Sequence, residues 1–202
     1  ITMDGFEADD IIGTLAKKAE KEGYTVYCMT PDKDFGQLVS ENIFIFKPAR
    51  MGNGAEVLGV PEILEKWEIS DVSQVIDILG LWGDAVDNIP GIPGIGEKTA
   101  KKLMQEYGSV EGLIANADKL KGKLKENVIN FTEQALLSKR LATILLDVPV
   151  EVKDFNFEVQ PPNKDILEPL FAELEFRTLG KRVFGDDFTV TEASKNNTGQ
   201  MD

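Results

Sequence analysis

The chain has 202 residues, of which 42% are hydrophobic and 28% are charged, and its formal net charge is −13 at pH 7. That length and apolar content predict one globular domain or two tightly joined subdomains. With no histidine and a single cysteine, the chain lacks the usual general base and the commonest zinc ligand, and it cannot assemble a histidine-dependent nucleophilic triad. Any catalysis must therefore depend on carboxylates and metal ions.

The sequence also argues against membrane insertion and secretion. No stretch approaches about 20 uninterrupted apolar residues, and the N-terminus has no basic region followed by an apolar one. Cys28 lies inside the apolar run 24–29, which predicts a buried thiol and no disulfide within the chain. We expect a cytoplasmic protein without membrane contact.

The first sixty residues alternate between helix and strand patterns. Residues 8–22 form an amphipathic pattern that ends at Gly23, which predicts a helix. Residues 24–30 and 42–46 are short β-rich runs, and a turn is expected at residues 52–54. This order predicts an α/β sheet with a parallel component.

From Pro61 onward the apolar spacing is helical. Helices are predicted over residues 61–67, 72–82, 97–107, 110–116, 125–145 and 165–174. Residues 148–159 are expected to be extended, and residues 189–202 to form a polar tail that frays. The sheet therefore gives way to a helical subdomain.

Seven carboxylates fall in three short clusters. They are Glu7, Asp9 and Asp10, then Asp32 and Asp34, then Asp84 and Asp87. Acidic groups that converge repel one another unless cations neutralise them, and Mg²⁺ or Mn²⁺ prefers such oxygen ligands. The second cluster follows a predicted strand, at the edge where α/β sheets place their ligands.

Each acidic cluster also has a purely structural interpretation. Acidic residues are favoured in the first turn of a helix by its dipole, which would explain the first cluster. Asp32 and Asp34 could form a simple Asx turn, and Asp84 and Asp87 could cap the segment that Pro90 interrupts. The occurrence of all three clusters in one chain favours a metal site.

The run Gly-Ile-Pro-Gly-Ile-Gly at residues 91–96 predicts a hairpin between two helices. Its isoleucines would anchor the turn in the core, and its glycines would let backbone N–H groups approach a phosphate. Residues 96–149 carry nine basic and seven acidic side chains, net +2, whereas residues 1–95 carry seven basic and seventeen acidic, net −10. The positive surface thus begins at the hairpin and predicts contact with a DNA backbone.

The predicted DNA-binding residues are Gly91, Ile92, Gly94, Ile95, Gly96, Lys98, Thr99, Lys101 and Lys102. A second group of lysines, at positions 119, 121, 123 and 125, is treated as auxiliary because such a run is usually a solvated face.

Four motifs together resemble the 5′ nuclease domain of bacterial DNA polymerase I, within the flap endonuclease class. They are Gly-Phe-Glu-Ala-Asp-Asp at residues 5–10, Thr-Pro-Asp-Lys-Asp at 30–34, Gly-Asp-Ala-Val-Asp-Asn-Ile-Pro-Gly at 83–91 and Gly-Ile-Gly-Glu-Lys-Thr-Ala at 94–100. The resemblance implies part of a PIN-like nuclease sheet followed by a helical subdomain with a helix-hairpin-helix motif.

The resemblance also implies a chemistry. A two-metal nuclease would cut 5′ flaps and RNA primers during DNA replication and repair. Glu7 and Asp9 would hold a first Mg²⁺ or Mn²⁺ ion, with Asp10 as a further metal ligand. Asp32, Asp34, Asp84 and Asp87 would serve the second ion, and K⁺ would bind to carbonyl groups of the hairpin.

On this interpretation residues 1–60 are the C-terminal part of the catalytic core, and residues 61–146 form the DNA-binding subdomain. Residues 147–188 would pack on the core, and residues 189–202 would be a tail or linker. No counterpart of the family's first strand, two further aspartates or helical arch precedes Ile1. We therefore expect a weakly active or inactive fragment, monomeric, from the bacterial cytoplasm and continuous with a polymerase region.

Two other functions fit parts of the sequence. Asp32-Lys33-Asp34 after a strand, with Asp84 and Asp87 later, mimics the motifs of a haloacid dehalogenase-type phosphatase, although that class would leave the hairpin unexplained. A DNA-binding fragment without catalysis is the second alternative.

Overall fold

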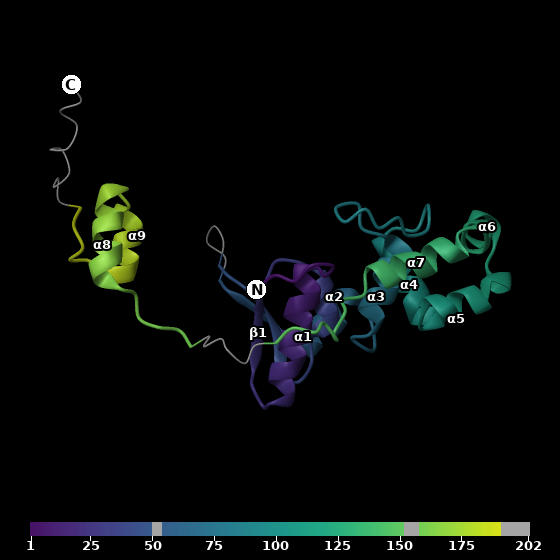
Figure 1. Ribbon diagram of the computed structural model, residues 1–202. Helices are drawn as coiled ribbons and strands as arrows, with labels where there is room; N and C mark the ends of the chain where they lie inside the picture. Colours follow the sequence, from purple (N-terminus) through teal and green to yellow (C-terminus); the bar gives the residue numbers. More distant parts are fainter. Residues whose placement is uncertain (50–53, 152–157, 191–202) are drawn as a thin grey trace, which may run out of the picture. The chain divides into compact units, whose positions relative to one another are not determined.

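The computed structural model describes residues 1–49, 54–151 and 158–190. The chain forms two compact units, Ile1–Glu151 and Val152–Asp202, whose elements are labelled in Figure 1. Among these described residues, no helix is both long and apolar enough to cross a membrane.

The first unit contains a three-stranded sheet in the order β1-β2-β3. Strand β1 (Val26–Met29) pairs in parallel with β2 (Ile43–Lys47), which pairs antiparallel with β3 (Glu56–Leu58). The predicted parallel component is confirmed. Strand β3 was not predicted, because its three residues are too few to show an alternating pattern.

The helices mostly follow the apolar spacing of the sequence. In the first unit they are α1 (Ala8–Lys21), α2 (Val60–Trp67), α3 (Gln74–Trp82), α4 (Glu97–Tyr107), α5 (Val110–Ala115), α6 (Gly122–Asn130) and α7 (Thr132–Leu141), with short 3₁₀ helices η1 (Asp34–Leu38) and η2 (Ala117–Lys119). The predicted ends of the first five helices agree to within two residues. The predicted turn at residues 52–54 and the extended segment 148–159 lie partly outside the described residues, and the polar tail at 189–202 lies almost entirely outside them.

The prediction of one helix over residues 125–145 is wrong. The chain breaks at Phe131 between α6 and α7, where the hydroxyl of Thr132 donates to the carbonyl oxygen of Val128 at 2.9 Å. Beyond α7 the chain is no longer helical, because the N–H of Ile144 binds Oε1 of Gln37 and that of Leu145 binds Oδ1 of Asp10. These partners lie more than 100 residues away in sequence, so periodicity could not reveal them.

Helix α3 is the centre of the first unit. It contacts η1, α4, α5 and α7, and Val75, Ile78, Leu79 and Leu81 on it are fully buried. Gly80 permits the close approach of α7, since a Cβ atom there would lie 2.8 Å from Cβ of Lys139. One core therefore runs continuously from the sheet to the helical part, with the predicted core residue Cys28 among its buried members.

The second unit is a pair of helices, α8 (Lys164–Glu173) and α9 (Arg177–Phe184). The buried ring of Phe171 lies 5.9 Å from that of Phe176 and 5.7 Å from that of Phe184, between ring centroids. Helix α8 confirms the prediction for residues 165–174, and α9 was not predicted.

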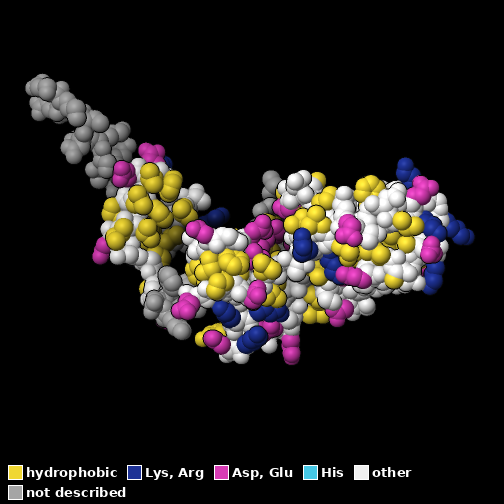
Figure 2. Space-filling model, turned by 45° about the vertical axis from the view of Figure 1, so that its right-hand side comes forward, with side chains coloured by type: hydrophobic (Ala, Val, Ile, Leu, Met, Phe, Trp, Pro, Cys, Tyr) yellow, Lys and Arg dark blue, Asp and Glu magenta, His cyan; other side chains and the backbone are white. Residues whose placement is uncertain are grey.

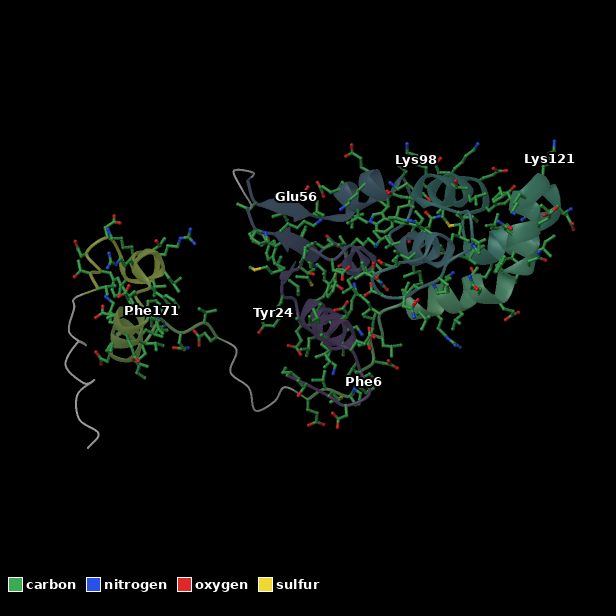
Figure 3. The ribbon with its side chains drawn as sticks, turned by 90° about the horizontal axis from the view of Figure 1, so that it is seen from above. Phe6, Tyr24, Glu56, Lys98, Lys121 and Phe171 are labelled. Carbon is green, nitrogen blue, oxygen red and sulfur yellow. The ribbon has the colours of Figure 1, made fainter. Side chains whose placement is uncertain are left out.

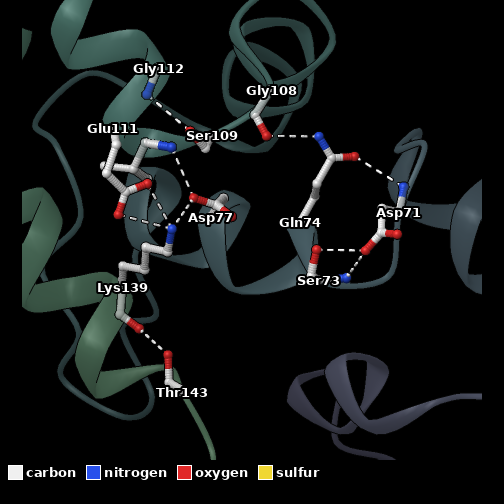
Figure 4. A network of polar contacts seen from close by, with 11 residues as sticks. Asp71, Ser73, Gln74, Asp77, Gly108, Ser109, Glu111, Gly112, Lys139 and Thr143 are labelled. Carbon is white, nitrogen blue, oxygen red and sulfur yellow. Dashed lines mark hydrogen bonds and ion pairs between the residues drawn. The ribbon is translucent and has the colours of Figure 1, made fainter.

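A polar network crosses the first unit beside α3 (Figure 4). The buried carboxylate of Asp77 accepts a hydrogen bond from the N–H of Val110 at 2.8 Å and pairs with Nζ of Lys139 at 2.6 Å. Lys139 also pairs with Glu111 at 2.8 Å. These hydrogen bonds raise the pKa of Lys139, although burial alone would lower it. The ion pairs of Lys139 therefore connect α7 to both α3 and α5.

Lys139→Met should lower the free energy of unfolding by about 3 kcal/mol, because it leaves the charge of Asp77 buried without a cation. The double variant Asp77→Asn, Lys139→Met should be less destabilised than Lys139→Met alone. Urea unfolding measures both, with the exposed Lys123→Met as control. A Lys139→Met variant as stable as the control would contradict the structural role of the pair.

Candidate metal centre and nucleic-acid interface

The three acidic clusters meet in one pocket of the first unit. The pocket has a volume of about 210 Å³, and six of the seven carboxylates line it: Glu7, Asp9, Asp10, Asp32, Asp34 and Asp87. The seventh, Asp84, is brought close to two of them, since carboxylate oxygens of Asp34, Asp84 and Asp87 all lie within 4.8 Å of one another. Residues up to 80 positions apart in sequence thus share one small volume.

Asp34 is one of three buried carboxylates in this group, with Asp10 and Asp84. It begins η1 after β1, and its N–H donates to Oδ1 of Asp32 at 2.9 Å. The Asx turn considered from the sequence is therefore present, and it holds the second carboxylate toward the pocket. Asp34 is 8% exposed, and its Oδ1 atom is buried without a hydrogen-bond partner in the described structure.

Burial, followed by the charge of Asp32, raises the pKa of Asp34 to about 7. The charges of Asp84 and Asp87 act in the same direction, and Lys33 partly offsets them. Burial also raises the pKa of Asp9, again with help from Asp32. Burial, reinforced by repulsion from neighbouring carboxylates, thus brings the pKa of Asp34 close to neutral pH.

Asp84 and Asp87 stand on a closed loop between α3 and α4. The N–H of Asp84 donates to the carbonyl oxygen of Ile89 at 2.8 Å, and the N–H of Ile89 donates back at 2.7 Å. Gly83 and Gly91 pack back to back at the base of this loop, both with positive φ, and a Cβ atom on Gly91 would lie 2.5 Å from the backbone nitrogen of Gly83. Only glycine fits at these two positions.

The predicted ligand Asp10 has a structural role that the sequence did not reveal. One of its oxygens accepts the N–H of Glu7 at 3.1 Å, and the other accepts the N–H of Leu145 at 2.8 Å. Asp10 therefore caps α1 and fastens the segment after α7, which forms one wall of the pocket. Both of its oxygens serve main-chain groups.

Sequence reasoning missed two side chains at the pocket. Lys33 forms an ion pair with Asp84, and this pairing lowers the pKa of Asp84 although burial alone would raise it. The amide of Gln37 donates to the carbonyl oxygens of Asp34 at 3.0 Å and Ala142 at 2.8 Å. The position of Lys33 between two aspartates was a usable signal, whereas nothing in the sequence pointed to Gln37.

The arrangement suits hard divalent cations. The pocket offers several carboxylate oxygens, and the unpartnered Oδ1 of Asp34 is a ligand atom that the protein itself does not satisfy. A buried polar atom of this kind is costly unless another group, such as a metal ion, binds it. The residues present therefore fit the metal that the sequence predicts.

The hairpin follows the Asp84–Ile89 loop directly. Ile92 and Ile95 are 2% and 4% exposed, and the N–H of Ile95 donates to the carbonyl oxygen of Ile92 at 3.0 Å. Gly94 lies at the exposed turn with φ +82°, and the exposed Gly96 is the N-cap of α4. The N–H of Thr99 donates to the carbonyl oxygen of Gly96 at 3.0 Å, so the N–H groups of Glu97 and Lys98 are the first-turn donors available to an anion.

Helices α6 and α7 hold the base of the hairpin. Oγ of Ser138 accepts the N–H of Gly91 at 3.0 Å, and the amide of Gln134 donates to the carbonyl oxygen of Gly91 at 2.7 Å. Asn127 donates to the carbonyl oxygen of Pro93 at 2.7 Å. The turn is therefore supported by hydrogen bonds from the side chains of two helices.

The predicted lysines of α4 are not equivalent. Lys98 and Lys102 are exposed, and Thr99 is half-buried at the start of the helix. Figure 3 shows Lys98 and Lys121 reaching outward on the same side, and basic side chains gather at the tip formed by α6 in Figure 2. These groups can face a polyanion.

Lys101 differs from the expectation. It is 9% exposed, its Nζ donates to the carbonyl oxygen of Lys66 at 2.8 Å, and it pairs with Glu97 at 2.9 Å and Glu68 at 3.5 Å. Its charge is neutralised within the protein because the helical spacing turns position 101 toward α2 rather than toward solvent.

Two protein-family models match consecutive parts of the chain. Residues 1–68 match the model described as 5′-3′ exonuclease, N-terminal resolvase-like domain, and residues 70–165 match the 5′-3′ exonuclease, C-terminal SAM fold. The change of model falls between α2 and α3.

The chain is also similar to segments of bacterial polymerases. It is 42% identical to DNA polymerase I of Bacillus subtilis over 195 residues, a match that covers 96% of this chain and 22% of that protein. It is 40% identical over 179 residues to the thermostable DNA polymerase I of Thermus aquaticus, which covers 89% of this chain and 21% of that protein. The chain thus spans about a fifth of these relatives.

Solved structures with a similar fold include a bacteriophage T5 5′-exonuclease with bound zinc ions, at a TM-score of 0.62 and 26% identity over 70% of this chain and 51% of that one. A T5 flap endonuclease in a pseudo-enzyme-product complex with DNA and metal ions gives a TM-score of 0.61 at 25% identity, covering 72% of this chain and 52% of that one. The catalytic core of Rad2 with DNA, at 17% identity and a TM-score of 0.54 over 90% of this chain and 58% of that one, shares the fold.

Asp34→Asn should stabilise the metal-free protein in a pH-dependent way. The unfolded chain loses the Asp34 proton near pH 4, whereas the folded chain keeps it to about pH 7. The native state therefore binds more protons between these values, and the contribution of Asp34 to stability falls as pH rises. In the presence of chelator, the free energy of unfolding of the variant should exceed that of the unaltered chain by an amount that grows from pH 4 to pH 7. The growth should be at most about 1.4 kcal/mol per pH unit and should then level off.

Chemical unfolding at several pH values measures this difference, with the exposed Asp147→Asn as control. Saturating Mn²⁺ should reverse the order, because metal binding to the native state stabilises only the protein that retains its ligand. A pH-independent difference between the two proteins would show that Asp34 is ionised in the fold.

Proposed function

Because this chain belongs to the 5′-3′ exonuclease family, we propose that it forms the metal-binding and DNA-gripping part of a 5′ nuclease of DNA polymerase I, acting on 5′ flaps and RNA primers. The observation that carries the proposal is the convergence of seven carboxylates in and beside one pocket that holds the unpartnered Oδ1 of Asp34. Two of these carboxylates, Asp84 and Asp87, stand on the loop that continues into the glycine hairpin. The matches to known proteins do not favour the phosphatase alternative.

The pocket would hold two Mg²⁺ or Mn²⁺ ions in the complete nuclease. Glu7 and Asp9 would bind one ion, and Asp32, Asp34, Asp84 and Asp87 would serve the other, directly or through water. When bound, the ions supply an activated water and stabilise the charge that develops on the phosphate. The protein's own contribution is to fix the carboxylates and to keep Asp34 buried until a cation takes the place of its proton.

The hairpin would bind the duplex beside the cleavage site. The exposed turn at Gly94 and Gly96 lets a phosphate approach the first N–H groups of α4, and Lys98 and Lys102 add positive charge. Phosphate contacts of this kind position a duplex without reading its sequence, as a nuclease that recognises a flap or nick requires. We propose that the protein acts as a monomer on such DNA.

We also propose K⁺ at the hairpin. The carbonyl groups of Gly91 and Pro93 already accept side-chain hydrogen bonds, so the ion would use other carbonyl groups of the turn. A monovalent cation there would sit between the turn and a DNA phosphate.

Asp87→Asn should weaken Mn²⁺ binding at least about tenfold, about 1.4 kcal/mol, because it removes a charged oxygen ligand. Loss of free Mn²⁺ signal in electron paramagnetic resonance measures the affinity. The cleavage of a 5′-flap duplex by the unaltered chain is expected to be weak, and where it is measurable it should fall in parallel. The exposed Asp118→Asn serves as control. Equal Mn²⁺ affinity in both variants would remove Asp87 from the metal site, and no Mn²⁺ binding by the unaltered chain would refute the site itself.

Replacing Lys98 and Lys102 with alanine should lower the slope of log binding constant against log salt by about 1.8, as expected for two lost phosphate contacts. Fluorescence anisotropy of duplex DNA at several KCl concentrations measures the slope. Adding Lys101→Ala should not change it further, because that ammonium is already neutralised. The pair Lys21→Ala and Lys181→Ala is the control, and an unchanged slope in the hairpin variant would exclude these lysines from the interface.

A further inference from the structure

Lys33 places an ammonium group against Asp84, beside the acidic pocket. It lies between Asp32 and Asp34 in sequence, and its Nζ forms an ion pair with Oδ2 of Asp84. The same Nζ lies 4.8 Å from the centroid of the Trp82 ring. A carboxylate and an aromatic face therefore hold the cation together, and both contacts favour a positive charge.

The two oxygens of Asp84 are differently engaged. Oδ1 accepts the N–H of Val86 at 2.9 Å, and Oδ2 contacts Lys33. The Asp84 side chain is only 7% exposed, whereas that of Lys33 is 32% exposed. The ammonium can therefore move into solvent, while the carboxylate must stay where it is.

The ammonium and a divalent ion would use the same carboxylate. Asp84 belongs to the group with Asp34 and Asp87 whose oxygens lie within 4.8 Å of one another, and Oδ1 of Asp34 beside it has no partner. A divalent ion bound by this group would lie close to Nζ of Lys33, and the two positive charges would repel at short range. The ammonium of Lys33 and the divalent ion therefore weaken each other's binding to Asp84.

We propose that Lys33 is a built-in counterion that competes with the divalent metal for Asp84 and so sets the metal affinity of the Asp34, Asp84 and Asp87 group. The inference depends on the metal site proposed above. Without metal, Lys33 offsets carboxylate repulsion and lets the pocket fold. When metal binds, Lys33 leaves Asp84, and the ring of Trp82 keeps the ammonium near the site.

A purely structural ion pair would behave differently. If Lys33 served only to orient Asp84, its loss would misplace a ligand and weaken metal binding. Competition predicts the opposite change, a tighter metal site in a less stable metal-free protein. The direction of the change in affinity therefore distinguishes the two roles.

Lys33→Met tests the proposal, because methionine keeps an unbranched apolar side chain against Trp82 and removes the charge. Mn²⁺ should bind roughly fivefold to tenfold more tightly to this variant, as measured by titration with electron paramagnetic resonance. In chelator its melting temperature should fall, and saturating Mn²⁺ should raise it by more than in the unaltered chain. Lys33→Gln, also neutral, provides a second variant if the first does not fold.

Lys33→Arg keeps the charge and should retain an affinity within about twofold of the original, and Lys21→Met controls for loss of an exposed lysine. Unchanged or weaker Mn²⁺ binding in both neutral variants would overturn the competition. Absence of Mn²⁺ binding by the unaltered chain would instead refute the proposed metal site, so the two failures are distinguishable.

Discussion

Repulsion among carboxylates that converge on one pocket is the constraint on which the rest of the site depends. Three segments bring seven acidic side chains to a volume of about 210 Å³ and its immediate edge. The protein reduces this repulsion in three different ways. It buries Asp34 so that its pKa rises to about 7, it pairs Asp84 with Lys33, and it hydrogen-bonds both oxygens of Asp10 to main-chain N–H groups. The negative charge that these three arrangements do not offset is available to bind a divalent cation.

The loop between α3 and α4 gives this acidic site a fixed relation to the hairpin that is proposed to bind DNA. Asp84 and Asp87 stand on one part of it and the hairpin on the next, and the close contact of Gly83 with Gly91 joins the two. Most residues of helix α3, which precedes the loop, are buried, and side chains of α6 and α7 hydrogen-bond the hairpin. A duplex bound at the hairpin would therefore place its backbone at a constant distance from the carboxylates. A nuclease of this design can select a position on DNA without reading its bases.

The distribution of charge along the chain matches the separation between the acidic site and the hairpin. The acidic part of the chain would bind cations, while basic residues outnumber acidic ones only from the hairpin to residue 149, where Lys98 and Lys102 are exposed. A net charge of −13 is therefore compatible with a polyanionic partner, because the partner responds to the charges near its binding surface. In about 0.1 M salt, charges more than about 10 Å away are largely screened. Lys101 shows that sequence counts overstate this field, since its ammonium is neutralised inside the protein by Glu97 and Glu68.

The sequence by itself determined most of the element order, the three acidic clusters and the hairpin, because each of these depends on residues within a few positions of one another. Only the tertiary structure decided which carboxylate is buried, which lysine faces solvent and where the long predicted helix breaks. Asp10 binds an N–H group 135 residues away, and Lys33 forms an ion pair with Asp84 from another segment of the chain. Such contacts form when the chain packs, and local propensity contains no information about them.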